Sequence, residues 1–400
     1  MDFIKKTALL IALLPNLLLA NEDSDIIVVG AGIVGASTAY HLAKQDVKVT
    51  VLDREGPASH ASRGTFAWLN ASWAKQPFAY HQLNQASVAY WHELAEQLDI
   101  PIKWEGSLEW FAGQQRSEKL VAQIAEQVTW GEPAEILATP QAQQLEPKVN
   151  FPQQATVAYS GNDGALDPQL ATEKLLAAAT ELGVQVRFPC NVTDIVRDQQ
   201  KVVVNSSCGS FSAKKVVFAV GANSKIIEAT TGLTIPQRST PGIIAITKPM
   251  PPVINRIIVA PGVHIHQRVD GRVVIGEQQG APKTEQHKQR LVNRPNSYPN
   301  EVLAQAHFQR MLTVAKGIVP ALANAEMEDM YIGWRPLPLD GHPVLGFSDE
   351  QQSTYIAVMH SGVTLAPIVG KLIAQELTEG AQDVLAPYRP QRDFELIKRY

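Results

Sequence analysis

Apolar and polar residues alternate along this chain in a way that predicts strands and helices in turn. Apolar, β-branched runs at residues 26–29 and 47–52 predict two buried strands, and the small residues of 36–44 between them predict a closely packed helix. In residues 79–98 the apolar side chains recur at helical spacing. Strands and helices that alternate in this way are typical of an α/β fold.

The alternation continues to the C-terminal end. Asp167 and Pro168 predict the N-cap and first turn of a helix over 169–182, and a strand follows at 184–188. Residues 101–150 mix short strands and helices. The other expected elements are a hairpin with strands 192–196 and 202–204, strands 215–220, 242–247, 263–267 and 273–276, helices 283–292 and 301–314, and a last strand, loop and helix over 331–340, 355–358 and 365–377.

The turn after the first strand carries the most informative motif. Gly30, Gly32 and Gly35 form G-x-G-x-x-G between a strand and a helix, and Asp53 ends the next strand 18 residues later (53 − 35). These glycines permit a tight turn, the approach of a pyrophosphate to the backbone, and close packing of the helix on the strand. The helix N-terminus offers N–H groups to phosphate, and the acid can accept a ribose hydroxyl. The unit therefore predicts Rossmann-like dinucleotide binding.

The composition of the chain indicates the number of domains and argues against nucleic-acid and metal binding. The chain has 400 residues, which favours two domains or one large discontinuous domain. It is 45% hydrophobic and 18% charged, as in ordinary globular proteins. The net charge of −4, with no basic stripe, argues against a nucleic-acid partner. No CxxC motif or Cys/His cluster occurs, so we expect no metal site.

The N-terminal segment resembles an export signal. Lys5 and Lys6 precede an almost wholly apolar run over 7–20, and the polar residues 21–24 follow. The run is shorter than the ~20 residues that cross a bilayer. We therefore expect residues 1–23 to be a signal peptide or an N-terminal anchor, and the protein to be exported to the periplasm or secreted rather than cytoplasmic. An uncleaved anchor would associate with the membrane through residues 7–20.

The two cysteines flank the expected hairpin. Because 190 + 208 equals 195 + 203, Cys190 faces Cys208 if Ile195 faces Val203. A register slip of one residue would put the two side chains on opposite faces. A disulfide and two free thiols both remain open at this point.

Four blocks of sequence together resemble one family. They are Val29–Gly35 with Asp53, Gly164–Pro168 with its helix, Val216–Ser224, and Gly333–Gly346, and the stretch Met359–Pro367 also fits. In order and spacing they resemble the FAD-dependent oxidoreductases of the D-amino acid oxidase and glycine/sarcosine oxidase superfamily. The resemblance implies a Rossmann-like FAD-binding domain from residues 24–85, 150–225 and 325–400. It also implies a discontinuous, mixed-sheet α+β substrate domain from residues 86–149 and 226–324.

The resemblance implies where FAD would bind. Asp53 would hold the adenosine ribose, Arg54 would lie along the adenine, and Val192 would meet the adenine through its backbone. The first turn of the last helix would approach the pyrimidine edge of the flavin, where its positive end stabilises reduced flavin. We expect His60 not to attach flavin covalently. The expected cofactor-binding residues are Gly30, Gly32, Ile33, Val34, Gly35, Asp53, Arg54, Ser62, Arg63, Gly64, Thr65, Val192, Gly221, Gly333, Gly362, Val363 and Thr364.

On the substrate side the resemblance points to Arg335, in Gly-Trp-Arg-Pro. A guanidinium gives a planar, two-pronged match to a substrate carboxylate. His264, His266 and Arg268 alternate, so period two places them on one sheet face. In the family this strand looks onto the flavin ring, so we expect His264 and His266 to join Arg335 in the catalytic site. A polar, solvated face is the alternative.

The implied reaction is hydride transfer to flavin from the carbon that bears an amine, which gives an imine that water hydrolyses. The substrate would be a D-amino acid, glycine or an N-methyl amino acid, and the acceptor oxygen or a quinone. Three alternatives stay open: a dehydrogenase of the same fold that reduces quinone, an NAD-dependent dehydrogenase, and a flavin-binding partner protein with no chemistry of its own.

Overall fold

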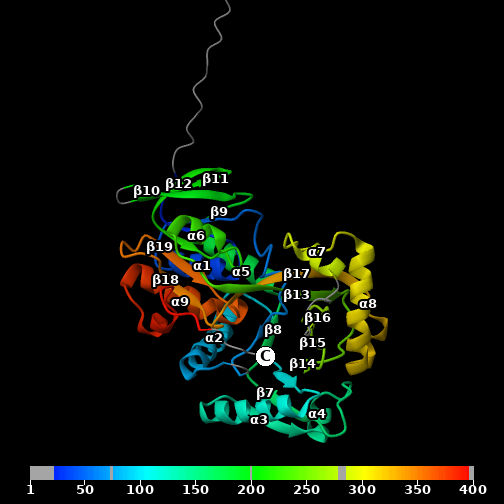
Figure 1. Ribbon diagram of the computed structural model, residues 1–400. Coiled ribbons are helices and arrows are strands. Elements are labelled where there is room, and N and C mark those ends of the chain that lie inside the picture. Colours follow the sequence, from blue (N-terminus) through cyan, green and yellow to red (C-terminus); the bar gives the residue numbers. More distant parts are fainter. Residues whose placement is uncertain (1–21, 73–74, 199–200, 278–284, 396–400) are drawn as a thin grey trace, which may run out of the picture.

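The computed structural model describes residues 22–72, 75–198, 201–277 and 285–395, and contains two large sheets (Figure 1). The expected export segment lies outside these residues, except that Glu22 and Asp23, the last two of the expected 1–23, lie in a strand. None of the helices in the described ranges is long and apolar enough to span a membrane.

The first sheet surrounds the strand that precedes the glycine turn. Its order is β10-β11-β12-β1-β2-β9, with β19 beside β12 and β18 beside β19. β1 pairs in parallel with β12 and β2, and this central position explains its continuous apolar run. The strands are β1 (Glu22–Val29), β2 (Val49–Leu52), β9 (Gln185–Arg187), β10 (Val192–Asp198), β11 (Lys201–Ser206), β12 (Gly209–Phe218), β18 (Val344–Phe347) and β19 (Thr354–Val358).

The second sheet has the order β17-β13-β16-β15-β14-β5-β7-β6. Its neighbours are antiparallel except β14 and β5, which run parallel, so the sheet is mixed as expected. The strands are β5 (Ser107–Glu109), β6 (Ala134–Ala138), β7 (Thr156–Ser160), β13 (Gln237–Thr247), β14 (Ile257–Ala260), β15 (Val263–Gln267), β16 (Val273–Glu277) and β17 (Met327–Pro338). A small third sheet contains β3 (Trp68–Leu69), β8 (Gly164–Leu166) and β4 (Ile102–Lys103).

The helices divide between the two sheets. Figure 1 shows α7 and α8 beside the second sheet and α3 and α4 at its far end, while α1, α2, α5 and α9 pack together near the first sheet. The helices are α1 (Ile33–Ala43), α2 (Phe78–Gln97), α3 (Gln114–Thr129), α4 (Thr139–Leu145), α5 (Pro168–Glu181), α6 (Lys225–Thr231), α7 (Glu285–Leu291), α8 (Glu301–Ile318) and α9 (Gly362–Glu379), with short 3₁₀ turns at Pro320–Asn324 and Asp383–Tyr388.

Small residues let α1 pack closely on α9. All of α1 except Val34 is buried. A Cβ at Gly370 of α9 would overlap Ser37 of α1, and the Ser37 hydroxyl donates to the Ala366 carbonyl at 2.7 Å. The small-residue pattern seen in the sequence is therefore a helix-packing pattern, since a larger side chain at either position would separate the two backbones.

Most expected elements lie within a few residues of the observed ones. The Asp167 carboxylate caps α5 as expected, accepting the N–H groups of Gln169 at 2.9 Å and Leu170 at 3.3 Å. The first strand is longer than expected, because residues 22–24 also pair with β12. β14 was not expected, because its short apolar run has no clear period.

The expected division into two domains stays a prediction. The second sheet takes in β7 and β17, whose segments were expected in the cofactor-binding part. α2 crosses the expected boundary at residue 85 and packs against α9.

The hairpin of β10 and β11 has the register that is one residue away from the one that would align the two cysteines. Ile195 faces Val204 instead of Val203. A register shift between Val192 and Asp194 then lets Val192 face Ser206, and 192 + 206 equals 190 + 208. This β-bulge therefore restores the alignment that the two cysteines need.

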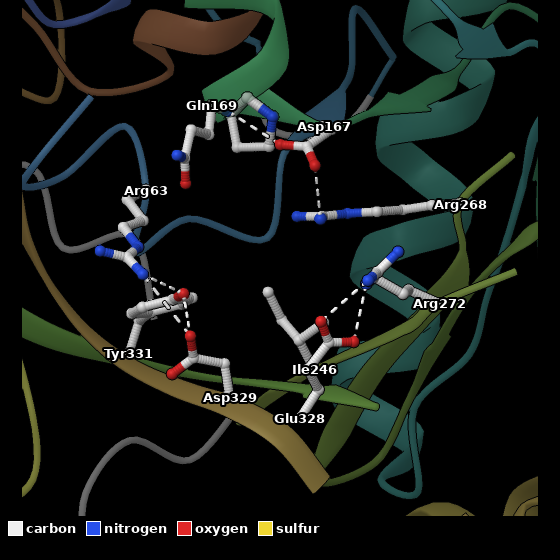
Figure 2. Close-up of a pocket in the computed structure, with 10 residues that line it drawn as sticks. Arg63, Asp167, Gln169, Ile246, Arg268, Arg272, Glu328, Asp329 and Tyr331 are labelled. Atoms are coloured by element: carbon white, nitrogen blue, oxygen red, sulfur yellow. Dashed lines mark hydrogen bonds and ion pairs between the residues drawn. The ribbon is translucent and has the colours of Figure 1, made fainter. Parts of the chain in front are cut away.

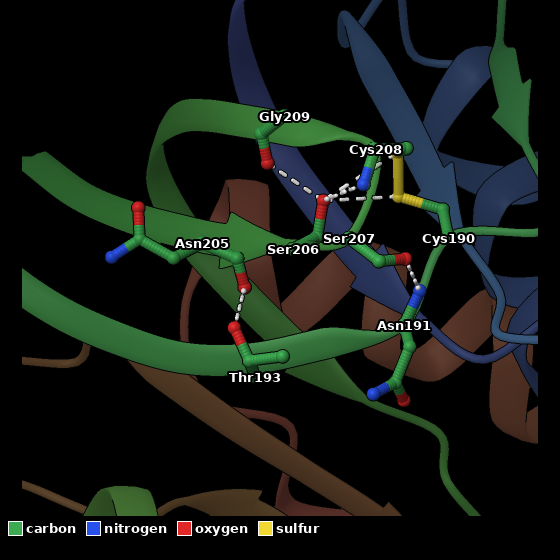
Figure 3. The surroundings of a disulfide bond; sticks show 8 residues. All are labelled: Cys190, Asn191, Thr193, Asn205, Ser206, Ser207, Cys208 and Gly209. Atoms are coloured by element: carbon green, nitrogen blue, oxygen red, sulfur yellow. Dashed lines mark hydrogen bonds between the residues drawn. A yellow bond between two sulfur atoms is a disulfide. The ribbon is translucent and has the colours of Figure 1, made fainter.

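Cys190 and Cys208 form a disulfide, with Cα atoms 5.1 Å apart (Figure 3). The alternative of two free thiols is therefore wrong for this structure. Cys190 is buried, and its N–H donates to the Asp53 carbonyl at 2.7 Å. The bridge thus fixes the start of the hairpin beside the end of β2.

We expect the denatured, unreduced protein to contain no free thiol. Replacing both Cys190 and Cys208 with Ala should lower the free energy of unfolding by about 3 kcal/mol, because the open chain gains freedom in the unfolded state. Denaturant titration measures this, and wild type unfolded with reductant should match the variant. Two free thiols in unreduced wild type would contradict the pairing.

Candidate functional site

The glycine turn after β1 has the geometry that its motif predicts. Gly30 has a φ of +110°, and a Cβ there would come 2.5 Å from the Ala219 carbonyl oxygen. A Cβ at Gly35 would overlap the Gly30 carbonyl. At Gly32, by contrast, a Cβ would meet only Ser62 Oγ, at 3.2 Å. The backbone at Gly32 therefore stays approachable, as a pyrophosphate requires.

Asp53 lies at the same turn, and its carboxylate fixes the neighbouring backbone through hydrogen bonds. Its Oδ2 accepts the Ala31 N–H at 2.8 Å, and its Oδ1 accepts those of Glu55 and Gly56 at 2.9 and 2.8 Å. A carboxylate can accept about four hydrogen bonds, so capacity for a further donor remains. The expected ribose contact stays a prediction.

The N-terminus of α1 points at this turn. Its N-cap, Gly32, has no side chain to cap the helix, and the Ile33 N–H donates to Ser62 Oγ at 3.0 Å. The next residues of the first turn are Val34 and Gly35. A helix start that lacks its own side-chain cap is a ready anion site, because the N–H groups and the helix dipole both favour negative charge.

Residues 61–65, which include four of the expected cofactor-binding residues, form a loop that crosses from the first sheet to the second; we call it the phosphate loop. A Cβ at Gly64 would come 2.5 Å from Gly333 Cα on β17, so only glycine fits where these backbones meet. The Arg63 guanidinium, expected at the phosphate, stacks instead over Tyr331, 4.1 Å from the ring centre. Thr65 Oγ1 accepts the Ala67 N–H at 3.3 Å and so holds the loop's exit.

α9 begins beside α1, and its first turn is fixed by neighbours. A Cβ at Gly362 would lie 3.3 Å from a methyl group of Val34. Pro367 cannot donate to the Val363 carbonyl, and Trp91 Nε1 donates to that oxygen instead at 2.9 Å. Asn70 N–H donates to Thr364 Oγ1 at 3.3 Å. The positive ends of α1 and α9 therefore converge on one region.

The other expected cofactor residues lie around the first sheet. Val192 starts β10 and is buried, while Gly221 follows β12 with a φ of +55°. The Arg54 guanidinium is occupied by His60 and by Glu55, at 3.3 Å, on the surface. The structure therefore does not show Arg54 free to lie along an adenine, and the roles of Val192 and Gly221 stay predictions.

His264 and His266 share one face of β15, as period two requires. Phe66 lies edge-on against both rings, with centres 5.4 and 4.7 Å away. His266 Nε2 lies 2.8 Å from the Phe66 carbonyl oxygen, and as its donor it fixes the backbone that leaves the phosphate loop. Burial, with the nearby charge of Arg268, lowers the pKa of His266 to about 3. The ring is therefore neutral at pH 7, and its expected catalytic role stays a prediction.

His264, like His266 with its Nδ1, has one buried ring nitrogen without a hydrogen-bond partner among the described residues. Its Nε2 is buried and makes no hydrogen bond to any residue that the structure describes. Burial, and next the positive charge of Arg335, lower the pKa of His264 to about 4. The ring is therefore neutral at pH 7 and has one nitrogen able to exchange a hydrogen bond with a ligand.

Arg335 lies across the second sheet on an exposed part of β17. It pairs with Thr240 of β13, and its guanidinium covers Gly242, where a Cβ would be only 3.1 Å from Nη2. Glycine at 242 thus leaves the space in which the guanidinium lies flat. The positive charge of Arg335 acts on the His264 ring, whereas the charge that acts on His266 is that of Arg268.

A separate pocket lies at the other end of these strands. Figure 2 shows side chains from Arg63, from the start of α5 and from the second sheet around it. Arg268 Nη1 bonds Asp167 at 2.7 Å, and Arg272 Nε bonds Glu328 at 2.7 Å. Of the expected site residues only Arg63 lines it, so we interpret these ion pairs as structural: the Arg268 pair joins the second sheet to the start of α5, and the Arg272 pair lies within the second sheet.

Sequence reasoning missed two aromatic residues that lie beside His264, where the flavin ring is expected. Phe66 covers the β15 histidines, and Trp68, whose ring centre lies 6.3 Å from that of His264, donates to Asp163 at 2.9 Å. The two aromatic residues Phe66 and Trp68 directly after the phosphate loop were an available signal, because aromatic side chains next to a cofactor loop are well suited to border its ring.

Comparison with known proteins assigns this geometry to a family. A family model described as FAD dependent oxidoreductase matches residues 25–376. Glycine oxidase of Geobacillus kaustophilus is 26% identical, over 91% of this chain and 96% of that protein. A component of the opine oxidase of Agrobacterium tumefaciens is 24% identical, over 92% of this chain and 98% of that protein. The crystal structure of the Geobacillus glycine oxidase superposes with a TM-score of 0.83 at 24% identity, over 94% of this chain and all (100%) of that one.

The residues present fit FAD as the cofactor. The approachable backbone at Gly32, the uncapped start of α1 and the adjacent start of α9 are all suited to phosphate and to negative charge. FAD is the cofactor of this family, and no group of three metal-ligating side chains comes together in the described ranges.

Gly32→Val should abolish FAD binding while the protein still folds, because the new side chain would meet only Ser62 and would occupy the phosphate approach. The measurement is flavin absorbance of the purified protein after reconstitution with FAD. Gly113→Val is the matched control, since a Cβ at Gly113 meets nothing within 4 Å. A fully yellow Gly32→Val protein would refute the cofactor placement.

Proposed function

This chain belongs to the FAD-dependent oxidoreductase family, and from that premise we propose that it oxidises the C–N bond of an α-amino acid whose carboxylate Arg335 binds. The protein is an FAD-dependent amino acid or amine oxidoreductase. The proposed substrates are glycine, N-methyl amino acids and D-amino acids, and the product is an imine that hydrolyses.

The observation that carries this proposal is the position of the Arg335 guanidinium over Gly242, from which its charge acts on the buried His264 ring. The guanidinium lies over Gly242 with its planar face along the sheet, which suits a two-pronged bond to a carboxylate. The name of the glycine oxidase relative supports a small amino acid as substrate. The name of the opine oxidase relative supports an amino acid with a substituted nitrogen.

Bound FAD supplies the chemistry by accepting a hydride from the carbon that bears the nitrogen. The chain's own residues position the substrate and set the charge around it. Arg335 binds the carboxylate, and neutral His264 offers its buried Nε2 as a second hydrogen-bonding group. Phe66 and Trp68 exclude water from the side of His264. The start of α9 favours negative charge near it.

Arg335→Lys should raise KM for amino acid substrates by about 10- to 100-fold, because lysine lacks the fork that binds a carboxylate through two parallel hydrogen bonds. The protein should retain FAD. Arg272→Lys is the control, since Arg272 pairs with Glu328 in the pocket of Figure 2 and should leave KM unchanged. Steady-state kinetics with glycine and sarcosine measure the effect. An unchanged KM in Arg335→Lys would contradict the proposal that Arg335 binds the substrate carboxylate.

The acceptor is proposed as oxygen or a quinone. Air-saturated buffer separates the two, because an oxidase reoxidises its reduced flavin in air within its turnover time. A dehydrogenase stays reduced until a quinone is added.

We also propose that the protein is exported. The apolar run over 7–20 follows Lys5 and Lys6, and the first described strand begins at Glu22. The disulfide of Cys190 and Cys208 supports an oxidising compartment.

Cleavage near Ala20 would leave β1 intact, because the strand starts two residues later. We expect the protein isolated from its native cells to lack residues 1–20 and to leave the cytoplasm with periplasmic or secreted markers. Intact mass measurement of the fractionated protein checks this. A full-length chain in the membrane fraction would indicate an anchor, and full-length soluble protein in the cytoplasm would contradict export.

A further inference from the structure

Five ionisable side chains lie buried together between the segment 68–72, α2 and the second sheet. They are Lys75, His81, Glu109, Glu132 and Asp163, and none is more than 7% exposed. They come from different parts of the chain: the segment before α2, α2 itself, β5, the turn after α3, and the residue before β8. Charged groups are seldom buried without a purpose, because removing them from water is costly.

Asp163 is the centre of this cluster. Its Oδ2 accepts hydrogen bonds from Ser107 Oγ at 2.6 Å, Trp68 Nε1 at 2.9 Å and Asn70 Nδ2 at 3.3 Å, and Ser72 Oγ lies 3.4 Å from both carboxylate oxygens. Three of these donors lie on residues 68–72. The carboxylate therefore holds the segment that continues from the phosphate loop.

The other acids in the cluster are incompletely bonded. Glu109 Oε1 and Glu132 Oε1 are buried and have no hydrogen-bond partner within the described part of the chain. His81 Nε2 lies 3.7 Å from the other oxygen of Glu132. An unpartnered carboxylate oxygen at full burial is satisfied most readily when the group is protonated or solvated by an internal water.

The cluster titrates near neutral pH. Burial raises the pKa of Asp163 to about 6, although its hydrogen bonds and the charge of Lys75 oppose this. Burial and then the charge of Asp163 raise the pKa of Glu132 to about 7 and that of Glu109 well above its usual range. Burial lowers the pKa of His81, and the charge of Lys75 adds to this.

The cluster contacts the cofactor side at two points. Lys75 Nζ lies 3.2 Å from Ser361 Oγ, at the N-cap of α9. Asn70, which donates to Asp163, also donates its backbone N–H to Thr364 Oγ1 in the first turn of α9. One or two residues therefore connect Asp163 and Lys75 with the start of α9 through hydrogen bonds.

We propose that Asp163 and its four ionisable neighbours form an internal proton store, which takes up the proton released when the substrate amine is oxidised and returns it when the cofactor is reoxidised. This inference rests on the proposed function. Asp163 does not touch substrate, and it acts by holding the proton and by positioning residues 68–72.

The protons and electrons balance as follows for an amino acid zwitterion. The nitrogen loses one proton, the Cα–H bond breaks with both electrons leaving as a hydride to FAD, and the nitrogen lone pair forms the C=N bond of an iminium. The substrate is oxidised by two electrons and FAD is reduced by two, while the released proton goes to the cluster. Oxygen or a quinone then takes two electrons and two protons, one from the reduced cofactor and one from the cluster.

The test is the pH dependence of anaerobic flavin reduction by sarcosine in holoenzyme variants. Glu132→Gln removes the acid of the cluster whose pKa is about 7 and should move the midpoint of the pH profile to lower pH by roughly one unit. Lys75→Met removes a positive charge and should move it to higher pH. The control Glu118→Gln changes an exposed acid on α3 and should not move it. Coincident profiles in all four proteins would overturn the proposal.

A second readout does not depend on activity. In the apo-protein, an acid whose pKa is higher in the folded than in the unfolded state stabilises the fold at low pH. This stabilisation is lost as the pH rises toward and through the folded-state pKa values of about 6 for Asp163 and about 7 for Glu132. The free energy of unfolding should therefore fall between about pH 4 and pH 7, and by less in Glu132→Gln. If no amine reduces the flavin, the proposed function is wrong. The stability titration would still show whether the cluster binds protons near neutral pH. A flat titration, equal in wild type and variant, would end the proposal.

Discussion

The close contact between α1 and α9 is the constraint on which the rest of this structure depends. Ser37 and Gly370 let the two backbones approach, and the hydroxyl-to-carbonyl bond from Ser37 to Ala366 fixes their register. The two helix N-termini consequently lie together, with Gly362 against Val34. The N-terminus of α1 lies at the glycine turn, and the N-terminus of α9 lies where the flavin ring is expected. A single packing contact therefore places two positive helix ends along one cofactor.

A second close contact joins the cofactor half to the substrate half. Gly64 and Gly333 meet backbone to backbone, which brings the phosphate loop onto β17 two residues before Arg335. His266 holds the next turn of the same loop through the Phe66 carbonyl, and Asp163 holds the residues after it. The segment 64–72 is therefore fixed from both sheets, and the expected ring and substrate sites lie along it.

The sequence predicted the cofactor half far better than the substrate half. The glycine turn, Asp53 and the Asp167 cap follow from local rules, because their function depends on backbone conformation and on residues a short distance apart. The sequence did not point to Asp163, Phe66 or Trp68, because the residues they contact are distant in sequence. Asp163 accepts hydrogen bonds from Trp68, 95 residues away, and from Ser107, 56 residues away. The hairpin register stayed open at the sequence level for a related reason, since a bulge inserts one residue without a sequence signal.

The central claim is that this protein oxidises amino acids through their amine, with Arg335 binding the carboxylate. The most direct measurement is anaerobic bleaching of the bound flavin, read by absorbance, across glycine, sarcosine, D-alanine and L-alanine, with methylamine and dimethylamine as matched amines that lack a carboxylate. The account predicts rapid bleaching by at least one amino acid and none by the simple amines. Bleaching by the amines alone, or by no compound in the set, would contradict it.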